Sequence, residues 1–434
     1  MKRNILLLFA FVFFIGLNAK SQTWSAVGVG TNAPVTSLTV FNNKLFTGGQ
    51  FTTAGGNNAN FFAKWDGATW SSPGGVGMNN NVNALAPHSG VLFTGGAFTL
   101  CGGNPMKFAS TWNGSVWGTV GPGMNNNINT YSEYNALLYA GGSFDTAGIG
   151  QANHIAQWDG TNWSPLGSGM NGDVNALVVY NNELYAGGNF TMAGGNASNY
   201  IARWNGATWD SVATGLNNTV NALTVYNGML YAGGAFTTAG GNPANYIAVW
   251  NGTTWDSVGT GMNNYVYALD SFGGFLFAGG AFTISGGTYT NYISQWDGAT
   301  WYSLGTGMND TVLSLSGYNS ELYAGGLFTI AGSGSANYIA KYSLPNGINE
   351  TYKTSEINVF PNPTNGIFSL SNLQNMTYYL QINDVLGNEL YNQTLSNSTA
   401  STINLSELTN GIYYWHLISD KGISAKGKLV IMKN

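Results

Sequence analysis

Short apolar segments alternate with Gly- and Asn-rich segments along most of the chain, and this alternation is periodic. A Gly-Gly pair follows a short apolar run seven times, at Gly48, Gly95, Gly141, Gly187, Gly233, Gly279 and Gly325. The spacing is 47 residues once and 46 residues five times. Self-similarity at a fixed period of this size is typical of solenoids and propellers. The chain is therefore expected to contain seven copies of one structural unit.

One full unit, which begins at Val220, predicts four short strands. Asn227-Gly228 indicates a tight turn after the first strand, and Asn251-Gly252 is a type I′ hairpin signal between the third and fourth strands. Because Gly and Asn interrupt every short apolar run, no helical stripe with a period of 3.6 can develop. Four strands in about 46 residues are typical of one propeller blade. The predicted strands cover 220–226, 230–237, 246–250 and 255–258.

The two ends of the array complement each other. The fourth-strand tryptophan recurs from Trp24 to Trp301, but one further period leads to Gly347, where no strand is predicted. The last repeat thus lacks a fourth strand, and an orphan fourth strand lies at residues 24–27. Joining them removes the open edge of the array, as in closed propellers. We expect an all-β fold, with a closed seven-bladed propeller at 22–343.

Thirteen of the 14 tryptophans lie in this array, at the third- and fourth-strand positions. A ladder of tryptophans can form a stacking platform for sugars, or it can pack neighbouring blades together. Burial of one tryptophan removes roughly 200 Å² from water, which is worth about 5 kcal/mol before the opposing costs. The composition therefore favours aromatic packing as the cohesion of the ring.

The first residues carry an export signal. Lys2 and Arg3 precede a 13-residue apolar run, Ile5–Leu17, and small residues follow. This pattern predicts a secretory signal peptide at 1–21, and the run is too short to cross a bilayer as a helix. No later segment is long and apolar enough to span a membrane, so the exported chain is expected not to be membrane-spanning. With one cysteine, Cys101, no intrachain disulfide can form, and a small buried side chain is the simplest interpretation.

After Leu344 the period ends, and the polar segment 344–354 is the predicted linker. Alternating segments beyond it predict the strands of a small β-sandwich at 356–360, 376–382, 412–418 and 427–432. Four motifs stand out in this region. They are Val359–Gly366 (VFPNPTNG), Asp384–Gly387 (DVLG), Leu405–Tyr414 (LSELTNGIYY) and Gly427–Ile431 (GKLVI).

Together these motifs resemble the type A C-terminal sorting domain of type IX secretion, the Por secretion tail of Bacteroidota, and the resemblance covers 355–434. It implies that the secretion translocon and its sorting machinery read the tail, and that the protein ends outside the cell or attached to the outer-membrane surface. An immunoglobulin-like accessory domain is the alternative. The sorting-signal residues implied by the resemblance are Pro361, Asn362, Pro363, Gly366, Gly387, Gly411, Tyr413, Gly427 and Lys428.

The repeat itself resembles two propeller families. A doubled glycine followed by a tyrosine and a tryptophan is similar to the kelch repeat, and the unit also resembles the GGxFT repeats of fungal polarity-marker propellers. Tyr200 and Trp204 have three residues between them, where kelch units have about six. The resemblance implies a seven-bladed propeller, and it implies no particular ligand because propellers host many functions.

Few residues in the array could perform acid–base or metal chemistry. Residues 22–343 hold 5 Lys+Arg and 12 Asp+Glu, and only two histidines, His88 and His154. This poverty of positive charge excludes the usual nucleic-acid binders. No H-x-H, H-E-x-x-H or C-x-x-C motif is present, so we expect no catalytic residue, metal or cofactor. Asp66, Asp159 and Asp297 share a hairpin position with asparagines, which indicates turn chemistry.

Blades 2 and 3 contain most departures from the repeat, and a ligand site is most plausible there. The candidate ligand-binding residues are Lys107, Glu133, Asp145 and His154. Their alternative explanation is drift within a tolerant array. The near-identical blades favour a secreted or surface propeller that binds a glycan or a protein. The alternative function is an extracellular carbohydrate-active or other enzyme that uses the propeller as its scaffold.

Overall fold

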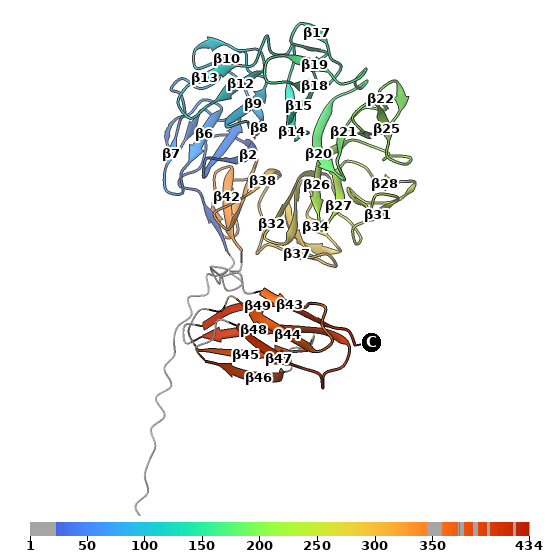
Figure 1. The fold of residues 1–434 in the computed structure, drawn as a ribbon. Helices are drawn as coiled ribbons and strands as arrows, with labels where there is room; N and C mark the ends of the chain where they lie inside the picture. The colour runs from blue at the N-terminus through green and yellow to red at the C-terminus, as the bar shows by residue number, and fades with distance from the viewer. Residues whose placement is uncertain are drawn as a thin grey trace, which may run out of the picture. The chain divides into compact units, whose positions relative to one another are not determined.

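Residues 23–344 form a ring of seven four-stranded antiparallel sheets, which confirms the predicted propeller (Figure 1). The computed structural model describes residues 23–344, 358–371, 373, 377–384, 389–396, 400–419 and 422–433. The predicted signal peptide at 1–21, the linker residues after Leu344 and the sorting residue Gly387 therefore lie outside the described residues. The chain divides into two compact units, Met1–Pro345 and Asn346–Asn434.

Each blade has its first strand innermost and its fourth strand outermost. The inner strands are β2 (Val35–Phe41), β8 (Val82–His88), β14 (Ile128–Tyr134), β20 (Val174–Tyr180), β26 (Val220–Tyr226), β32 (Val266–Phe272) and β38 (Val312–Tyr318). The second strands are β3 (Lys44–Gly49), β9 (Val91–Gly96), β15 (Leu137–Gly142), β21 (Glu183–Gly188), β27 (Met229–Gly234), β33 (Phe275–Gly280) and β39 (Glu321–Gly326). The third strands are β6 (Phe62–Trp65), β12 (Ala109–Trp112), β18 (Ile155–Trp158), β24 (Ile201–Trp204), β30 (Ile247–Trp250), β36 (Ile293–Trp296) and β42 (Ile339–Ser343).

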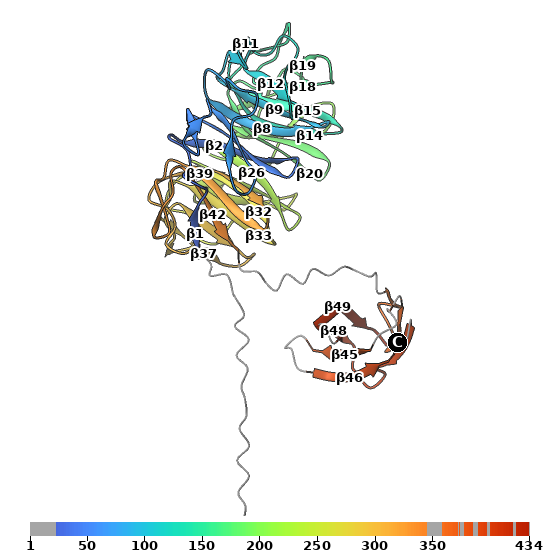
Figure 2. The same cartoon turned by 90° about the vertical axis from the view of Figure 1, so that its left-hand side faces the viewer.

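The ring closes through a strand from the start of the described chain. Blades 1 to 6 end in β7 (Trp70–Ser71), β13 (Trp117–Thr119), β19 (Trp163–Pro165), β25 (Trp209–Ser211), β31 (Trp255–Ser257) and β37 (Trp301–Ser303). In blade 7 the fourth strand is β1 (Trp24–Ala26), which pairs with β42 so that Trp24 lies opposite Tyr342. The edge-on view shows β1 beside β42 at the edge of the ring (Figure 2). The predicted exchange of strands between the two ends is confirmed.

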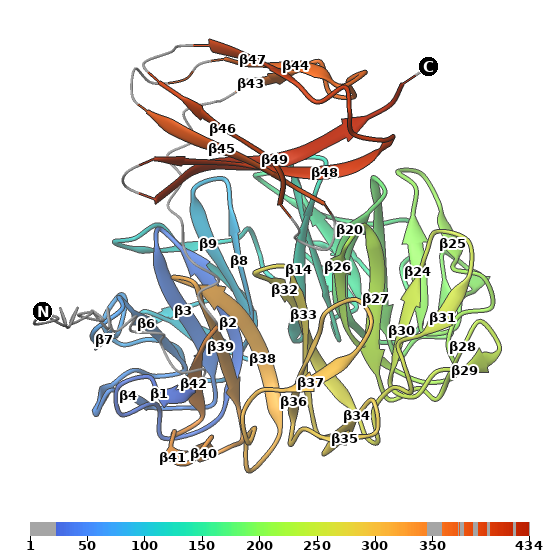
Figure 3. The same cartoon turned by 90° about the horizontal axis from the view of Figure 1, so that it is seen from below.

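A short hairpin lies between the second and third strands of every blade and defines one face of the ring. These hairpins lie together at the lower edge of the propeller in Figure 3, and we call this side the small-hairpin face. The sequence analysis did not predict them. They are β4–β5 (Thr53–Ala54, Asn57–Asn58), β10–β11 (Leu100–Cys101, Asn104–Pro105), β16–β17 (Thr146–Ala147, Gly150–Gln151), β22–β23 (Met192–Ala193, Asn196–Ala197), β28–β29 (Thr238–Ala239, Asn242–Pro243), β34–β35 (Ile284–Ser285, Thr288–Tyr289) and β40–β41 (Ile330–Ala331, Gly334–Ser335).

The Gly-Gly pair ends each second strand because any side chain there would clash. In blade 5 a Cβ on Gly233 would overlap Val266 of the next inner strand, and a Cβ on Gly234 would overlap the Thr219 carbonyl oxygen. The pairing of inner and second strands is also shifted by a bulge, which falls between Val220 and Ala222 in this blade and recurs in the other six. A bulge leaves one residue unpaired and redirects its side chain.

Indole hydrogen bonds join neighbouring blades. The Nε1 of each fourth-strand tryptophan donates to a main-chain carbonyl at the end of the preceding fourth strand, as Trp209 does to Leu166 at 3.0 Å. The same bond forms in five other blades. Trp117, which follows the single 47-residue spacing, is the exception, because its buried Nε1 has no partner among the described residues. The tryptophans therefore pack the blades, as the composition predicted.

One predicted turn is wrong. Asn251-Gly252 was expected to form a type I′ turn, but Trp250 pairs with Trp255 and encloses a four-residue loop. The Asn251 Oδ1 accepts hydrogen bonds from the main-chain N–H groups of Thr253 and Thr254 at 2.8 and 2.9 Å. An asparagine that bonds its own loop in this way does not need a positive φ. The first turn of the blade does fit the prediction, since Asn227 and Gly228 have φ values of 48° and 71°.

The second unit is a β-sandwich of two sheets, which appear as two layers in Figure 3. One sheet has the order β43 (Asn358–Phe360), β44 (Ile367–Ser371), β47 (Ala400–Asn404). The other has the order β46 (Glu389–Leu395), β45 (Tyr378–Asn383), β48 (Gly411–Ser419), β49 (Gly422–Ile431). Three strands, β44, β46 and β47, were not predicted from the sequence, and polar residues predominate in β46 and β47. The core includes Leu380, Ile403 and Trp415.

Candidate functional site

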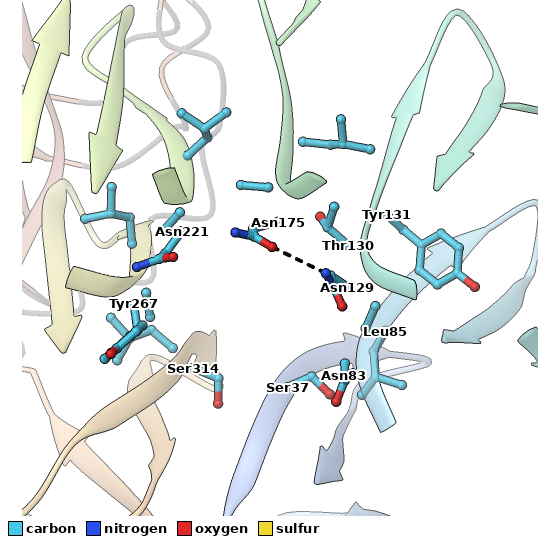
Figure 4. Close-up of a pocket in the computed structure, with 18 of the residues that line it drawn as sticks. Ser37, Asn83, Leu85, Asn129, Thr130, Tyr131, Asn175, Asn221, Tyr267 and Ser314 are labelled. Atoms are coloured by element: carbon cyan, nitrogen blue, oxygen red, sulfur yellow. Dashed lines mark hydrogen bonds between the residues drawn. The ribbon is translucent and has the colours of Figure 1, made fainter. Parts of the chain in front are cut away.

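The centre of the ring contains a polar cavity of about 220 Å³, lined by all seven inner strands (Figure 4). Its lining residues belong to the first half of each inner strand, so it lies toward the small-hairpin face. The bulged second residues of the inner strands supply much of its polar surface. These residues are Thr36, Asn83, Asn129, Asn175, Asn221, Tyr267 and Leu313 in blades 1 to 7, and those from Asn83 to Tyr267 line the cavity.

The cavity asparagines also bind neighbouring blades. The Asn129 amide donates to Asn175 Oδ1 at 3.3 Å, the bond drawn in Figure 4. Asn175 and Asn221 donate to the first carbonyl of the next inner strand at 3.4 and 3.1 Å. The Asn221 contact uses the amide nitrogen as the donor. Its Oδ1 accepts no hydrogen bond in the described part of the chain, so it remains an open acceptor. The arrangement offers acceptors to hydroxyl donors.

No charged side chain lines this cavity. Apart from two tyrosines, Tyr131 and Tyr267, every lining residue is an alanine, leucine, serine, threonine or asparagine. Asp270 lies further along β32, and burial raises the pKa of its carboxyl to about 6 although the main chain at Ser271 and Gly317 donates to it. The cavity is therefore suited to neutral ligands with hydroxyl and amide groups.

The repeated asparagines of the small-hairpin face are occupied by turn bonds. In blade 5 the Asn217 Oδ1 accepts from the main-chain N–H groups of Thr237 and Thr238, and its amide donates to Thr237 Oγ1. Equivalent bonds recur around the ring. The carboxylate of Asp66 likewise accepts main-chain bonds from Thr69 and Ala68, which lower its pKa to about 2. These side chains support the loops.

Of the four candidate ligand-binding residues, Lys107, Asp145 and His154 lie toward the small-hairpin face, whereas Glu133 lies at the other end of blade 3. Lys107 is exposed, and its carbonyl accepts a bond from Met124 N at 3.0 Å on the small-hairpin face. Asp145 lies at the same junction, where Asn125 Nδ2 donates to it at 2.6 Å. Bonds from Asn125 and Thr146, and the nearby charge of His154, hold the pKa of Asp145 below its usual value. A ligand role for these residues stays a prediction.

His154 and Glu133 have other partners. The His154 Nδ1 lies 3.3 Å from Asp173 Oδ1, at the junction of blades 3 and 4. Glu133 lies beside the β14–β15 turn, at the opposite end of blade 3 from Asp145. Its Oε2 is 2.9 Å from the Nδ1 of the buried His88, which occupies the position of Tyr134 and Tyr180 in the next two blades. The sequence analysis singled out Glu133 without this partner.

The amide ring of the cavity was missed from the sequence. Its signal is the recurrence of Asn after the first valine or isoleucine of the unit, at Asn83, Asn129, Asn175 and Asn221. Strict alternation along a strand says nothing about which of these residues is bulged. The position becomes informative only once the first strand is known to line a channel.

The sorting motifs of the C-terminal unit meet on its last strand. The Asn362 amide donates to Lys428 O at 2.8 Å, and its Oδ1 accepts from Val430 N at 2.9 Å. Gly366 has a φ of 112°, and a Cβ there would lie 3.0 Å from Ser406 Cα. Hydrogen bonds of Asn362 thus connect the first motif of the tail to the fourth.

The other motif residues are packed in the same unit. The Tyr413 hydroxyl donates to the Thr409 carbonyl at 2.8 Å, across the turn that precedes β48. Gly427 lies opposite Trp415, and a Cβ there would be 2.8 Å from the indole ring. Gly411 pairs with Ile431, which brings the third and fourth motifs together. Pro361 and Pro363 flank Asn362 in the segment that binds β49.

Comparisons with known families agree with both units. Residues 358–432 match the secretion system C-terminal sorting domain. The chain therefore carries a type IX sorting domain. Residues 120–273 match the Rax2 C-terminal β-propeller domain. The sorting domain assigns the protein to the cell surface or the extracellular space. Among the described residues no helix is long and apolar enough to cross a membrane.

One solved structure with a TM-score above 0.5 shares the fold at low sequence identity. The extracellular domain of a hybrid two-component system from B. thetaiotaomicron is 12% identical with a TM-score of 0.51, and the match covers 95% of this chain and 58% of that chain. A computationally designed protein, Ika8, is 15% identical with a TM-score of 0.47, over 74% of this chain and 100% of that one. No curated protein matches the chain. In the described residues, no group of three or more His, Cys, Asp or Glu side chains is placed to hold a metal ion.

Proposed function

We propose that the propeller is a binding module for a glycan or protein ligand at the cell surface or in the surrounding medium. The observation that carries this proposal is the neutral cavity, which seven nearly equivalent blades build from amide and hydroxyl groups. An acid–base enzyme needs several ionisable groups converging on one point. Here the candidate groups Glu133 and Asp145 lie at opposite ends of a blade, which favours binding over catalysis.

The proposed export has two steps. The predicted signal peptide at 1–21 directs the chain to the periplasm, and the secretion machinery then recognises the sorting domain. The hydrogen bonds of Asn362 with the last strand bring the first and fourth motifs together, which supports a single recognition surface made from separate motifs. We assign the source to the Bacteroidota and the blades to a kelch-like type on the strength of the sequence motifs.

The export step is tested by deleting residues 355–434 and fractionating the cells. We expect the truncated protein to accumulate in the periplasm, and the full chain to reach the surface or the medium. A periplasmic fraction that contains folded propeller shows that the deletion leaves that unit intact. Surface delivery of the truncated protein would overturn the assignment of the tail as the export signal.

The binding function is tested with the full chain purified after export. It is screened against immobilised glycans and surface proteins, and in parallel for release of reducing sugars from polysaccharides. Saturable binding without turnover is the expected result. Turnover without added metal would replace the binding module with an enzyme.

A further inference from the structure

Aromatic residues replace the small or polar residues of the repeat near the cavity at the junction of blades 5 and 6. The residue before the inner strand is Pro34, Asn81, Asn127, Asp173, Thr219 and Thr311 in six blades, but it is Tyr265 in blade 6. Two residues later, the bulged position holds Tyr267 where four other blades have asparagine. Both aromatic replacements thus fall in the same blade and beside the same cavity.

The two tyrosines join a third one in an aromatic cluster, in which Tyr265 makes edge-to-face contacts with both of the others. The ring centroids of Tyr265 and Tyr246 are 5.8 Å apart, and those of Tyr265 and Tyr267 are 6.3 Å apart. Tyr265 is 42% exposed, whereas Tyr267 lines the cavity. The cluster therefore has one exposed ring, Tyr265, in contact with a ring that lines the cavity.

The backbone holds Tyr246 in place. Its φ of 63° lies in the left-handed region, which a bulky residue rarely adopts. Its N–H donates to Phe236 O at 2.8 Å and its carbonyl accepts from Gly234 N at 3.0 Å. The equivalent residue of every other blade has the same conformation. The ring of Tyr246 is thus a fixed support for the exposed face of Tyr265.

Polar groups face the same part of the cavity. Figure 4 shows Asn221, Tyr267 and Ser314 along one side of it. The amide nitrogen of Asn221 donates to Val266 O, and its Oδ1 accepts no hydrogen bond in the described part of the chain. The Ser314 Oγ is also without a partner among the described residues, although this residue is only 8% exposed. This oxygen is buried against Gly325, so the open acceptor at Asn221 is the group that a ligand hydroxyl would reach.

We infer that this corner of the cavity binds a terminal unit of a neutral glycan. The apolar face of the sugar stacks on Tyr265, while its hydroxyls bond with Asn221 and Tyr267. The volume of about 220 Å³ is below the range of roughly 300–1,000 Å³ for drug-sized ligands, so it suits a single sugar ring. The absence of charged lining residues selects a neutral sugar over a uronic or sialic acid. This inference rests on the proposed binding function and narrows it to one site and one ligand class.

The repeat itself supplies test variants that preserve the fold. Tyr265→Thr introduces the residue of blades 5 and 7, and Tyr267→Asn introduces the residue of blades 2 to 5. The matched control is Tyr289→Thr, which removes a 76% exposed tyrosine from the small hairpin of the same blade. The probes are neutral hexasaccharides of glucose, mannose, galactose and N-acetylglucosamine, titrated against the full chain by calorimetry. An acidic hexauronate is titrated in parallel.

We expect one or more neutral probes to bind the unmodified protein and Tyr289→Thr with equal affinity. Loss of the stacking surface should weaken binding by about tenfold or more in Tyr265→Thr and again in Tyr267→Asn. Undiminished binding in the double variant would place the ligand elsewhere and overturn this site, while the binding function would stand. Preference for the hexauronate, or binding of surface proteins alone, would overturn the neutral-glycan assignment. Failure to bind any glycan or protein would remove the proposed function as well.

Discussion

The Trp24 indole donates a hydrogen bond of 2.8 Å to the main-chain carbonyl of Leu304, a residue 280 positions away in the chain. Equivalent bonds elsewhere span 43 positions and join blades that the chain connects directly. Trp24 also packs against Tyr342, with ring centroids 5.0 Å apart. A three-residue strand, β1, therefore closes the ring, and Trp24 is its one buried side chain.

Replacing Trp24 with alanine should open the ring at blade 7. Loss of a buried tryptophan costs about 3–5 kcal/mol, and the Leu304 carbonyl also loses its partner. Amide hydrogen exchange should accelerate first in β42, whose outer edge β1 covers. The control is Trp255→Ala, which removes the same contact from an interior blade. Unchanged exchange in β42 of the Trp24 variant would contradict this role for β1.

The hydrogen-bonding part of the tryptophan contribution can be separated from its packing. Trp209 donates to Leu166 O at 3.0 Å, whereas the buried Nε1 of Trp117 has no partner among the described residues. A phenylalanine removes the N–H in both cases and keeps an aromatic ring. Trp209→Phe should therefore lower the free energy of unfolding by about 1–2 kcal/mol more than Trp117→Phe. Urea denaturation of the two variants measures the difference, and equal losses would show that these bonds add nothing to stability.

The sequence predicts the propeller because its signals are local and repeated. The glycine pair recurs where two backbones meet, and the mismatch between Trp24 and Gly347 reveals the closing strand. Asn251-Gly252 was misassigned because an asparagine side chain can replace a positive φ in stabilising a tight loop. The same Asn-Gly dipeptide can therefore form either a two-residue turn or the start of a longer loop that the asparagine side chain stabilises.

The candidate site could be predicted only in part, because it depends on how neighbouring blades are aligned. His88 and Glu133 are 45 positions apart, and their contact requires the register between two inner strands. The direction of Asn221 depends on a bulge, which strict alternation does not predict. The departures that the sequence analysis sought in blades 2 and 3 were charged residues. The aromatic departures at Tyr265 and Tyr267 change no charge and were missed.

The partly buried carboxyl of Asp270 should make the propeller more stable in mild acid than at neutral pH. Burial raises its pKa from 3.8 to about 6, so the folded state binds a proton more tightly than the unfolded chain. The free energy of unfolding should therefore fall as the pH rises from 4 to 6, by at most about 3 kcal/mol, and then level off.

Asp270→Asn isolates this contribution from that of other carboxyls. The variant should be more stable than the unmodified protein at pH 7.5, and the two should converge near pH 4, where Asp270 is protonated in the folded state. Urea denaturation at both pH values gives the difference. A variant that is equally stable at pH 7.5 would show that water solvates this carboxyl in the folded protein.

The single thiol should be inert in the folded protein. Cys101 is fully buried, and burial raises the pKa of its thiol to about 12 despite the contact with Ser110 Oγ at 3.5 Å. Because the thiolate is the reactive form, iodoacetamide at pH 8 should label the chain only after unfolding in urea. Five other blades carry alanine at this position, so Cys101→Ala should change the free energy of unfolding by less than about 1 kcal/mol. Rapid labelling of the native protein would mean that the small hairpin β10–β11 opens, and slow labelling with a stable alanine variant supports a packing role for the thiol.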